Sequence, residues 1–199
     1  MVLSISRTAC DIVYFHKLDG LMIFIALFRG LNVGGSHKIK MADLVAFLNR
    51  QGGEKTKHYI QSGNLVFHSD EQVHDLAQRL EPAFEKEFGF SSQIILRTLP
   101  ELEAAHAAYP FDRKDREQKF MMTGFARQNP NADALAVLEG LLADGELVAQ
   151  SGNEFFFYYG NGSARSKVAN LNFEKKIGTA LTVRNRRTIS KLIEMAADF

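Results

Sequence analysis

The amino-acid sequence predicts an α+β fold of two similar halves, and two observations support this prediction. Apolar runs of strand length alternate with amphipathic segments of helical period, and the order strand, helix, strand, strand, helix, strand occurs twice. The tetrapeptide Gln-Ser-Gly-Asn at 61–64 occurs again at 150–153, each time between two predicted strands. We therefore predict two tandem ferredoxin-like (βαββαβ) halves with antiparallel or mixed sheets, plus a C-terminal helix.

The first half is predicted to span residues 21–98. The apolar residues from Leu21 to Phe28 are typical of a buried strand, and Leu44, Phe47 and Leu48 recur at helical spacing. We expect Pro82 to kink or divide the second helix. The predicted elements are strand Met22 to Arg29, helix Met41 to Arg50, strand Lys57 to Gln61, strand Asn64 to His68, helix Glu71 to Phe88 and strand Gln93 to Leu96.

The second half is predicted at 118–199, after a connector at 99–117 that contains a short helix, Pro100 to Ala107. Residues 1–20 show no clear period, so we expect a dispensable N-terminal extension and a core that begins at Met22. The predicted elements of the second half are strand Phe120 to Ala126, helix Ala132 to Ala143, strand Glu146 to Ala149, strand Glu154 to Tyr159, helix Ala164 to Ile177, strand Ala180 to Val183 and helix Thr188 to Ala197.

Composition excludes several classes of protein. With 46% hydrophobic and 24% charged residues and 4 prolines, the 199-residue chain is predicted to be globular throughout. A formal net charge of +1 excludes a globally basic nucleic-acid binder, but it leaves room for a local basic patch. Cys10 is the single cysteine, which excludes an internal disulfide and favours the cytoplasm. The longest apolar run is too short to span a membrane, so we expect no membrane partner; the oligomeric state is left open.

The first candidate binding edge is the segment 25–41, where an apolar strand gives way to a glycine-rich basic loop and then to a helix. In a ferredoxin-like half the first and second strands end at the same edge, so this loop and the hairpin at 61–64 are expected to lie together. Positive-φ glycines expose backbone N–H groups, and nearby lysines supply positive charge, which favours phosphate or carboxylate binding. The alternative is that the glycines only turn the chain and the lysines are solvated. The candidate residues are Arg29, Gly30, Asn32, Gly34, Gly35, Lys38, Lys40, Gln61, Ser62, Gly63 and Asn64.

The second candidate edge is basic. Between Ser163 and Lys191 there are eight cations and one anion, Glu174, and the third and fourth strands of this half are expected to end together there. The aromatic run from Phe155 to Tyr159 precedes it, which raises the alternative of a nucleic-acid-binding module. Successive strand residues face opposite sides, however, so at least one set of these aromatics must form core.

The sequence supports no cofactor, metal site or catalytic residue. The phosphate-binding motif GxxxxGK[ST] and the dinucleotide motif GxGxxG are both absent, and the histidines show neither HxxxH nor HExxH spacing. No serine lies in a GxSxG turn. Whether the protein is an enzyme is therefore left open.

The segments Ala26 to Met41 and Tyr59 to Phe67 closely resemble a bacterial family known as domain of unknown function 1697, and the resemblance runs from Met22 to Ala197. The block 181–192 is similar to the family's C-terminal Thr-Thr-Arg-Asn-Trp-Asn-Thr pattern, with Val183 in place of the second threonine and Arg186-Arg187 in place of Trp-Asn. The resemblance implies the same fold and important loops, but no substrate or reaction. It adds as candidate binding residues Ser166, Lys167, Arg184, Asn185 and Thr188.

These observations lead to one preferred function and two alternatives. We expect a cytoplasmic protein that binds an anionic or phosphorylated small molecule in a polar, basic cleft. The alternatives are a nucleic-acid-binding module that uses the C-terminal basic surface, and an interaction protein whose loops are purely structural.

Overall fold

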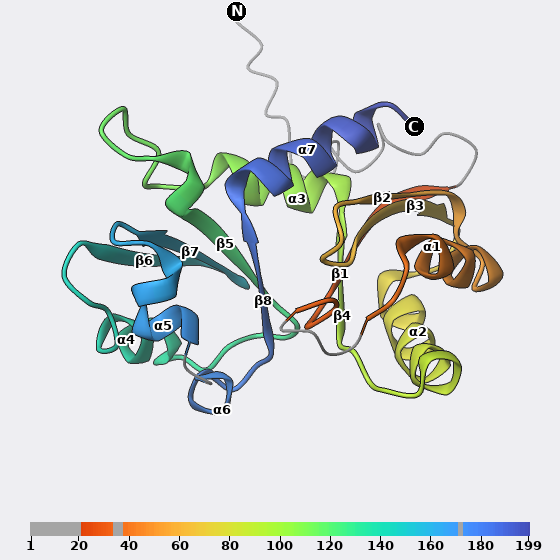
Figure 1. Cartoon of the computed structure of the whole chain (residues 1–199), viewed down its shortest axis with the longest axis horizontal. Helices are drawn as coiled ribbons and strands as arrows, with labels where there is room; N and C mark the ends of the chain where they lie inside the picture. Colours follow the sequence, from red (N-terminus) through yellow and green to blue (C-terminus); the bar gives the residue numbers. More distant parts are fainter. Residues whose placement is uncertain (1–20, 34–37, 171–172) are drawn as a thin grey trace, which may run out of the picture.

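The computed structural model describes residues 21–33, 38–170 and 173–199, which form two four-stranded antiparallel sheets side by side (Figure 1). The strand orders are β2-β3-β1-β4 and β6-β7-β5-β8, which are equivalent, and they confirm the two predicted ferredoxin-like halves. The first sheet contains β1 (Met22–Phe28), β2 (Glu54–Tyr59), β3 (Asn64–Ser69) and β4 (Ile94–Thr98). The second contains β5 (Met121–Ala126), β6 (Glu146–Ser151), β7 (Glu154–Tyr159) and β8 (Leu181–Asn185). The expected extension at 1–20 lies outside the described residues.

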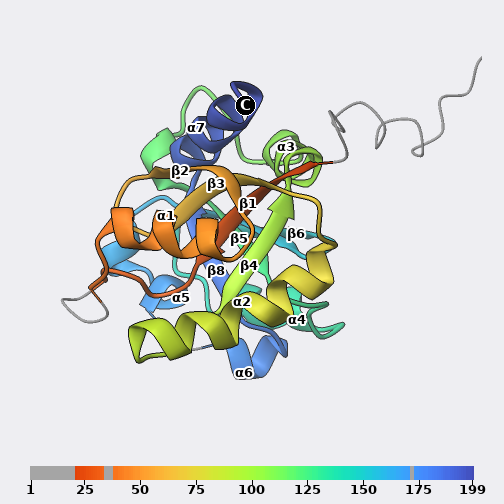
Figure 2. The same cartoon turned by 90° about the vertical axis from the view of Figure 1, so that its right-hand side faces the viewer.

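The strand β1 is covered on both faces of the first sheet, which explains why it is apolar at every position. Phe24, Ala26 and Phe28 face the helices α1 (Met41–Arg50) and α2 (Val73–Phe88), which lie across the sheet in Figure 2. Ile25 and Leu27 face the opposite way, into a second core with α3 (Leu99–Ala107) and α7 (Arg186–Ala197). The helix α2 continues through Pro82, so the expected division does not occur.

The two helices predicted before β8 in the second half are shorter in the structure. The expected helix from Ala164 to Ile177 is wrong: the structure has η3 (Ser163–Arg165), α5 (Lys167–Asn170) and α6 (Glu174–Ile177). Ser166 interrupts it, because its backbone is extended and its hydroxyl accepts the N–H of Ala169 at 3.1 Å, which begins a new helix. The remaining elements are η2 (Gln118–Phe120) and α4 (Ala134–Glu139), which is shorter than the predicted 132–143.

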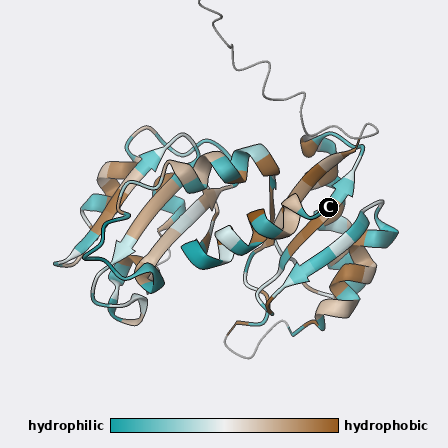
Figure 3. Ribbon diagram, turned by 90° about the horizontal axis from the view of Figure 1, so that it is seen from above, coloured by the Kyte–Doolittle hydropathy of each residue, from teal (hydrophilic) through white to brown (hydrophobic). Residues whose placement is uncertain are grey.

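The C-terminal helix α7 connects the halves. It follows β8 of the second half, but it packs on β2 and β3 of the first half and beside α3. Figure 3 shows α7 from above, with alternating hydrophilic and hydrophobic segments. Ile189 and Leu192 on its apolar side share a buried cluster with Val66 of β3. One face of the first sheet is therefore completed by the last helix of the chain.

The two Gln-Ser-Gly-Asn segments are not equivalent in the structure. Residues 60–63 form a four-residue loop between β2 and β3, whereas the second hairpin has a two-residue turn at 152–153. The strand register instead equates Asn64 with Glu154, because Asn64 opposes Leu27 and Glu154 opposes Phe125 at the same place in each half. The sequence match is thus offset by one residue from the structural match.

Four arginines join the halves in two equivalent pairs. Arg29, after β1, forms an ion pair with Glu174 at 2.8 Å, and Arg127, after β5, forms one with Glu81 at 2.7 Å. Glu174 also accepts the N–H of the first residue of β8 at 2.9 Å, and Glu81 accepts the N–H of the first residue of β4 at 2.9 Å. In the second pair, Arg97 of β4 donates to the last carbonyl of β5 at 2.8 Å, and Arg184 of β8 donates to the last carbonyl of β1 at 2.7 Å. The halves thus contact one another reciprocally, as two subunits do around a twofold axis.

Candidate functional site

The loop after β1 and the β2–β3 hairpin lie together, which confirms the adjacency predicted from topology. The N–H of Phe28 donates to the carbonyl of Gly63 at 2.8 Å, and the side-chain amide of Asn32 donates to the carbonyl of Gln61 at 2.7 Å. Gly63 adopts a φ of 71°, and a Cβ there would lie 2.7 Å from the Cβ of Phe28. Only glycine therefore allows this close approach of hairpin and strand.

Asn32 organises the loop. With a φ of 55°, its side-chain oxygen accepts the N–H of Ile39 at 2.9 Å, and its amide donates to the carbonyl of Ile39 at 3.1 Å. Ile39 is thereby held in the first core, while Lys38 and Lys40 on either side of it are exposed. Gly34 and Gly35 lie outside the described residues, and Gly30, with a φ of 74°, turns the chain after β1.

The carbonyls of Gln61, Ser62 and Gly63 in the hairpin loop accept hydrogen bonds, whereas the N–H groups of the loop do not donate any to the described residues. Ile60, an exposed β-branched residue, has a φ of 51°, which is a strained conformation. The carbonyls of Tyr59, Gln61 and Ser62 accept side-chain hydrogen bonds from Asn64, Asn32 and Arg184. No residue in the described ranges accepts a hydrogen bond from the backbone N–H groups of 60–63. Such a run of N–H groups is a favourable environment for an anion.

Arg184 links the second half to this hairpin. Its guanidinium donates to the side-chain oxygen of Asn64, to the carbonyls of Phe28 at 2.7 Å and Ser62 at 3.1 Å, and within its own strand to the Thr182 hydroxyl and the Val183 carbonyl. These contacts use all five N–H groups of an arginine. Burial lowers the pKa of Arg184 to about 10. Arg184 therefore brings the two predicted edges together, but it has no donor left for a ligand.

The other C-terminal candidates lie at helix starts. The side-chain oxygen of Asn185 accepts the N–H of Arg187 at 2.9 Å and caps α7, which explains why this helix begins two residues earlier than predicted. Thr188 is buried in the first turn of the same helix. Ser166 is buried at the start of α5, whereas Lys167 is exposed.

The two edges share a cavity of about 510 Å³. Arg29 enters it from the first half; the second half contributes Met122, Tyr159, Ser163, Val168, Ala169, Phe173, Glu174, Leu181 and Val183. The Arg29 side chain is 41% exposed and donates to Gln93 at 3.3 Å and to Glu174 at 2.8 Å. Its three other N–H groups have no acceptor among the residues that the structure describes. Of the predicted binding residues, Arg29 alone is among those that line this cavity, and sequence reasoning missed Ser163 and Glu174 as its neighbours.

The basic run divides into inward and outward groups. Arg186 points inward, where it donates to the carbonyl of His106 at 2.9 Å and to Asp112 at 3.0 Å. The outward cations flank residues of the cavity, and none of them forms an ion pair with a described acid. The outward cations beside cavity residues are Arg165, Lys167, Lys175 and Lys176, and Arg187 is also exposed, in the first turn of α7.

The aromatic strand β7 is committed to core packing. Phe155, Phe157 and Tyr159 lie in one buried cluster, and Phe156 lies in another on the opposite face. Tyr158 is partly exposed and carries the guanidinium of Arg116 at 5.1 Å from its ring centre. The strand β7 therefore does not present a row of exposed aromatic rings on which nucleic-acid bases could stack.

No helix in the described residues combines the length and the apolar character of a membrane span. Nowhere in 21–33, 38–170 and 173–199 do three or more histidine, cysteine or acidic side chains gather in a way that could hold a metal ion.

Comparisons with known proteins agree with the fold. The model of one family, described as "Protein of unknown function (DUF1697)", matches residues 22–156. Among solved structures, the conserved bacterial protein SP0830 from Streptococcus pneumoniae is similar, with a TM-score of 0.71 and 27% identity over 88% of this chain and 99% of that one. No curated protein matches the sequence significantly. The family match includes both the loop after β1 and the β2–β3 hairpin and covers more than half of the chain, so this protein belongs to the DUF1697 family.

Proposed function

We propose that the protein binds a small anionic ligand, a phosphate ester or a carboxylate, in the cavity that Arg29 lines. The observation that carries the proposal is that Arg29, which follows β1 at the start of the predicted anion-binding loop, lines one cavity with Ser163 and Val168 of the second edge. A volume of about 510 Å³ is within the range typical of small-molecule sites.

Charge around the cavity favours an anion. Arg29 and Glu174 balance one another, and the exposed cations that lie next to lining residues in the sequence add an excess of positive charge to this part of the chain. A hydrogen bond to a charged group contributes about 1.5–3 kcal/mol, so two bonds from Arg29 contribute about 3–6 kcal/mol. Micromolar affinity needs about 8 kcal/mol, so at least one of the flanking cations must also contact the ligand.

Titration with inorganic phosphate, followed by calorimetry, tests the proposal. Arg29→Ala should weaken phosphate binding at least tenfold. Arg127→Ala is the matched control, because it removes the equivalent ion pair in the other half without touching the cavity. Absence of phosphate binding at 10 mM, or an equal loss in both variants, would refute the proposal.

A second variant tests the contribution of the loop. Lys38→Ala combined with Lys40→Ala removes two exposed charges, and each surface change should alter stability by no more than about 0.5 kcal/mol. We expect weaker phosphate binding with an unchanged melting temperature. Unchanged affinity in the folded variant would show that these lysines are merely solvated.

A further inference from the structure

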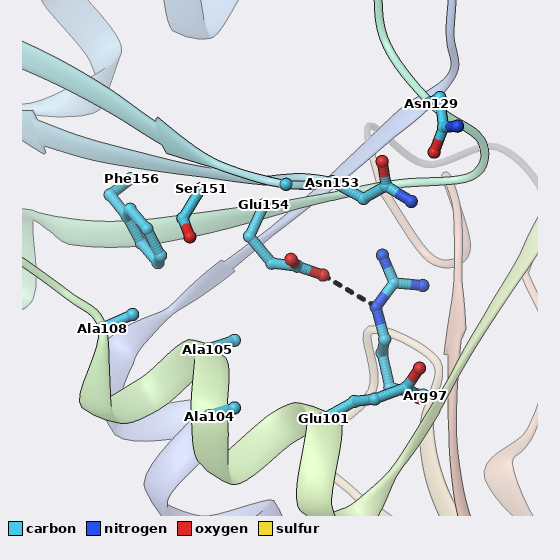
Figure 4. Close-up of a pocket in the computed structure, with 11 residues that line it drawn as sticks. Arg97, Glu101, Ala104, Ala105, Ala108, Asn129, Ser151, Asn153, Glu154 and Phe156 are labelled. Atoms are coloured by element: carbon cyan, nitrogen blue, oxygen red, sulfur yellow. Dashed lines mark hydrogen bonds and ion pairs between the residues drawn. The ribbon is translucent and has the colours of Figure 1, made fainter. Parts of the chain in front are cut away.

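The face of the molecule at Arg97 carries a second cavity of about 490 Å³, which shares no lining residue with the first (Figure 4). It lies between α3 and the start of β7. Three alanines of the α3 segment, Ala104, Ala105 and Ala108, form one wall, and Phe156 lies across from them.

The internal symmetry places a larger side chain at the equivalent position of the other copy. Counting from the equivalent arginines Arg97 and Arg184, Ala105 of α3 corresponds to Leu192 of α7. Leu192 and Ala105 both belong to the buried cluster that contains Val66, but Ala105 also lines the cavity. Alanine has a smaller side chain than leucine, so it leaves room for the cavity beside α3.

Uncommitted polar groups surround the opening. Arg97, whose side chain is 10% exposed, donates to Glu154 at 2.9 Å, to the Leu96 carbonyl and to the Ala126 carbonyl, so two of its five N–H groups have no described acceptor. The second carboxylate oxygen of Glu154 accepts no hydrogen bond from the described residues. Three further lining residues have side chains that form no hydrogen bond with the described residues: Asn129, Ser151 and Asn153.

The charges of the walls select the ligand class. A simple anion would face the carboxylate of Glu154, and a simple cation would face Arg97. A molecule with both charges a few bonds apart complements both signs. From this geometry we propose that the cavity binds a free α-amino acid, with its carboxylate toward Arg97 and its ammonium toward Glu154. The space between Phe156 and the alanines then receives the amino-acid side chain.

The proposal is tested with the twenty common α-amino acids as probes, first by thermal shift and then by calorimetry on the full chain. At least one amino acid should bind below 10 mM. Its N-acetylated and C-amidated analogues should each bind at least tenfold more weakly, because each lacks one of the two charges.

Two alanine-to-leucine substitutions on α3 distinguish the effect of filling the cavity from the effect of a larger side chain elsewhere on the helix. Ala104→Leu fills the space and should weaken binding at least tenfold, whereas Ala107→Leu, exposed on the same helix and outside the cavity, should not. If Ala104→Leu lowers the melting temperature, Ser151→Val narrows the same cavity from β6 and provides the comparison. Failure of every amino acid to bind, equal binding of the blocked analogues, or unchanged affinity in both cavity variants would overturn the proposal.

Discussion

Replacing Arg184 with alanine should destabilise the protein strongly, because this side chain connects the two halves through neutral oxygens. It removes three hydrogen bonds across the interface, to Phe28, Ser62 and Asn64. The carbonyl of Phe28 and the amide of Asn64 belong to residues that are 0% exposed, so water cannot readily replace the lost donors.

The magnitude follows from these three bonds. Each unsatisfied buried acceptor costs about 1–3 kcal/mol, and part of this is offset because a charged guanidinium no longer has to be desolvated. We expect a loss of about 3–5 kcal/mol in the free energy of unfolding. For a chain of this size that corresponds to a decrease of about 6–20 °C in melting temperature. Arg184→Lys keeps the charge but at most three donors, so it should lose about half as much.

Urea unfolding at fixed protein concentration measures this effect, with the midpoint shifting and the slope unchanged. Arg187→Ala is the matched control, since Arg187 is exposed and close in sequence, and it should change stability by less than about 0.5 kcal/mol. A loss below about 1 kcal/mol for Arg184→Ala would refute the view that this residue holds the halves together.

Three further predictions concern pH, nucleic acids and the N-terminus. Burial, together with the charge of Arg186, lowers the pKa of His106 from 6.5. The unfolded state therefore binds more protons than the folded state, and the free energy of unfolding should fall as pH falls below 6.5. His106→Gln should make the urea midpoint less dependent on pH between 7.5 and 5.5. Binding to single-stranded RNA should be weak, and its log affinity should fall with log salt at a slope of about −2, which is the slope for three exposed cations that each neutralise one phosphate; submicromolar affinity at about 150 mM salt in an anisotropy titration would contradict this. These three are Arg165, Lys167 and Arg187. A chain that begins at Met22 should still melt cooperatively in calorimetry, because β1 begins at that residue; loss of the transition would show that the preceding segment is integral.

The sequence predicted the elements whose period is simple. The helix at 41–50 was predicted with its observed bounds, because Leu44, Phe47 and Leu48 give one continuous buried face. The meeting of the β1 loop with the hairpin was also predictable, since it follows from the direction of the strands rather than from any side chain.

Tertiary partners decided what the sequence could not predict. The basic run favoured an outward role for Arg184, but its cross-half acceptors lie more than a hundred residues away along the chain. Ser166 divided a predicted helix through a capping bond that competes with helix continuation. Arg97 and Glu154 were missed, although a charged residue in the apolar strand 94–98 was a usable signal, because a buried charge requires a partner.

The reciprocal arginine contacts have a consequence for how such a protein can change. In a dimer of identical subunits one substitution alters both symmetric positions, so each position must suit two environments at once. A single chain that contains both halves lacks this constraint: Asn64 and Glu154 occupy equivalent places with different charge, and Leu192 and Ala105 with different volume. In one copy the arginine donates only to neutral oxygens and connects the halves, and in the other it keeps an ion pair beside an open space. Because the two halves lie in one chain, one of the two equivalent contacts can maintain stability while the other changes so that it can bind a ligand.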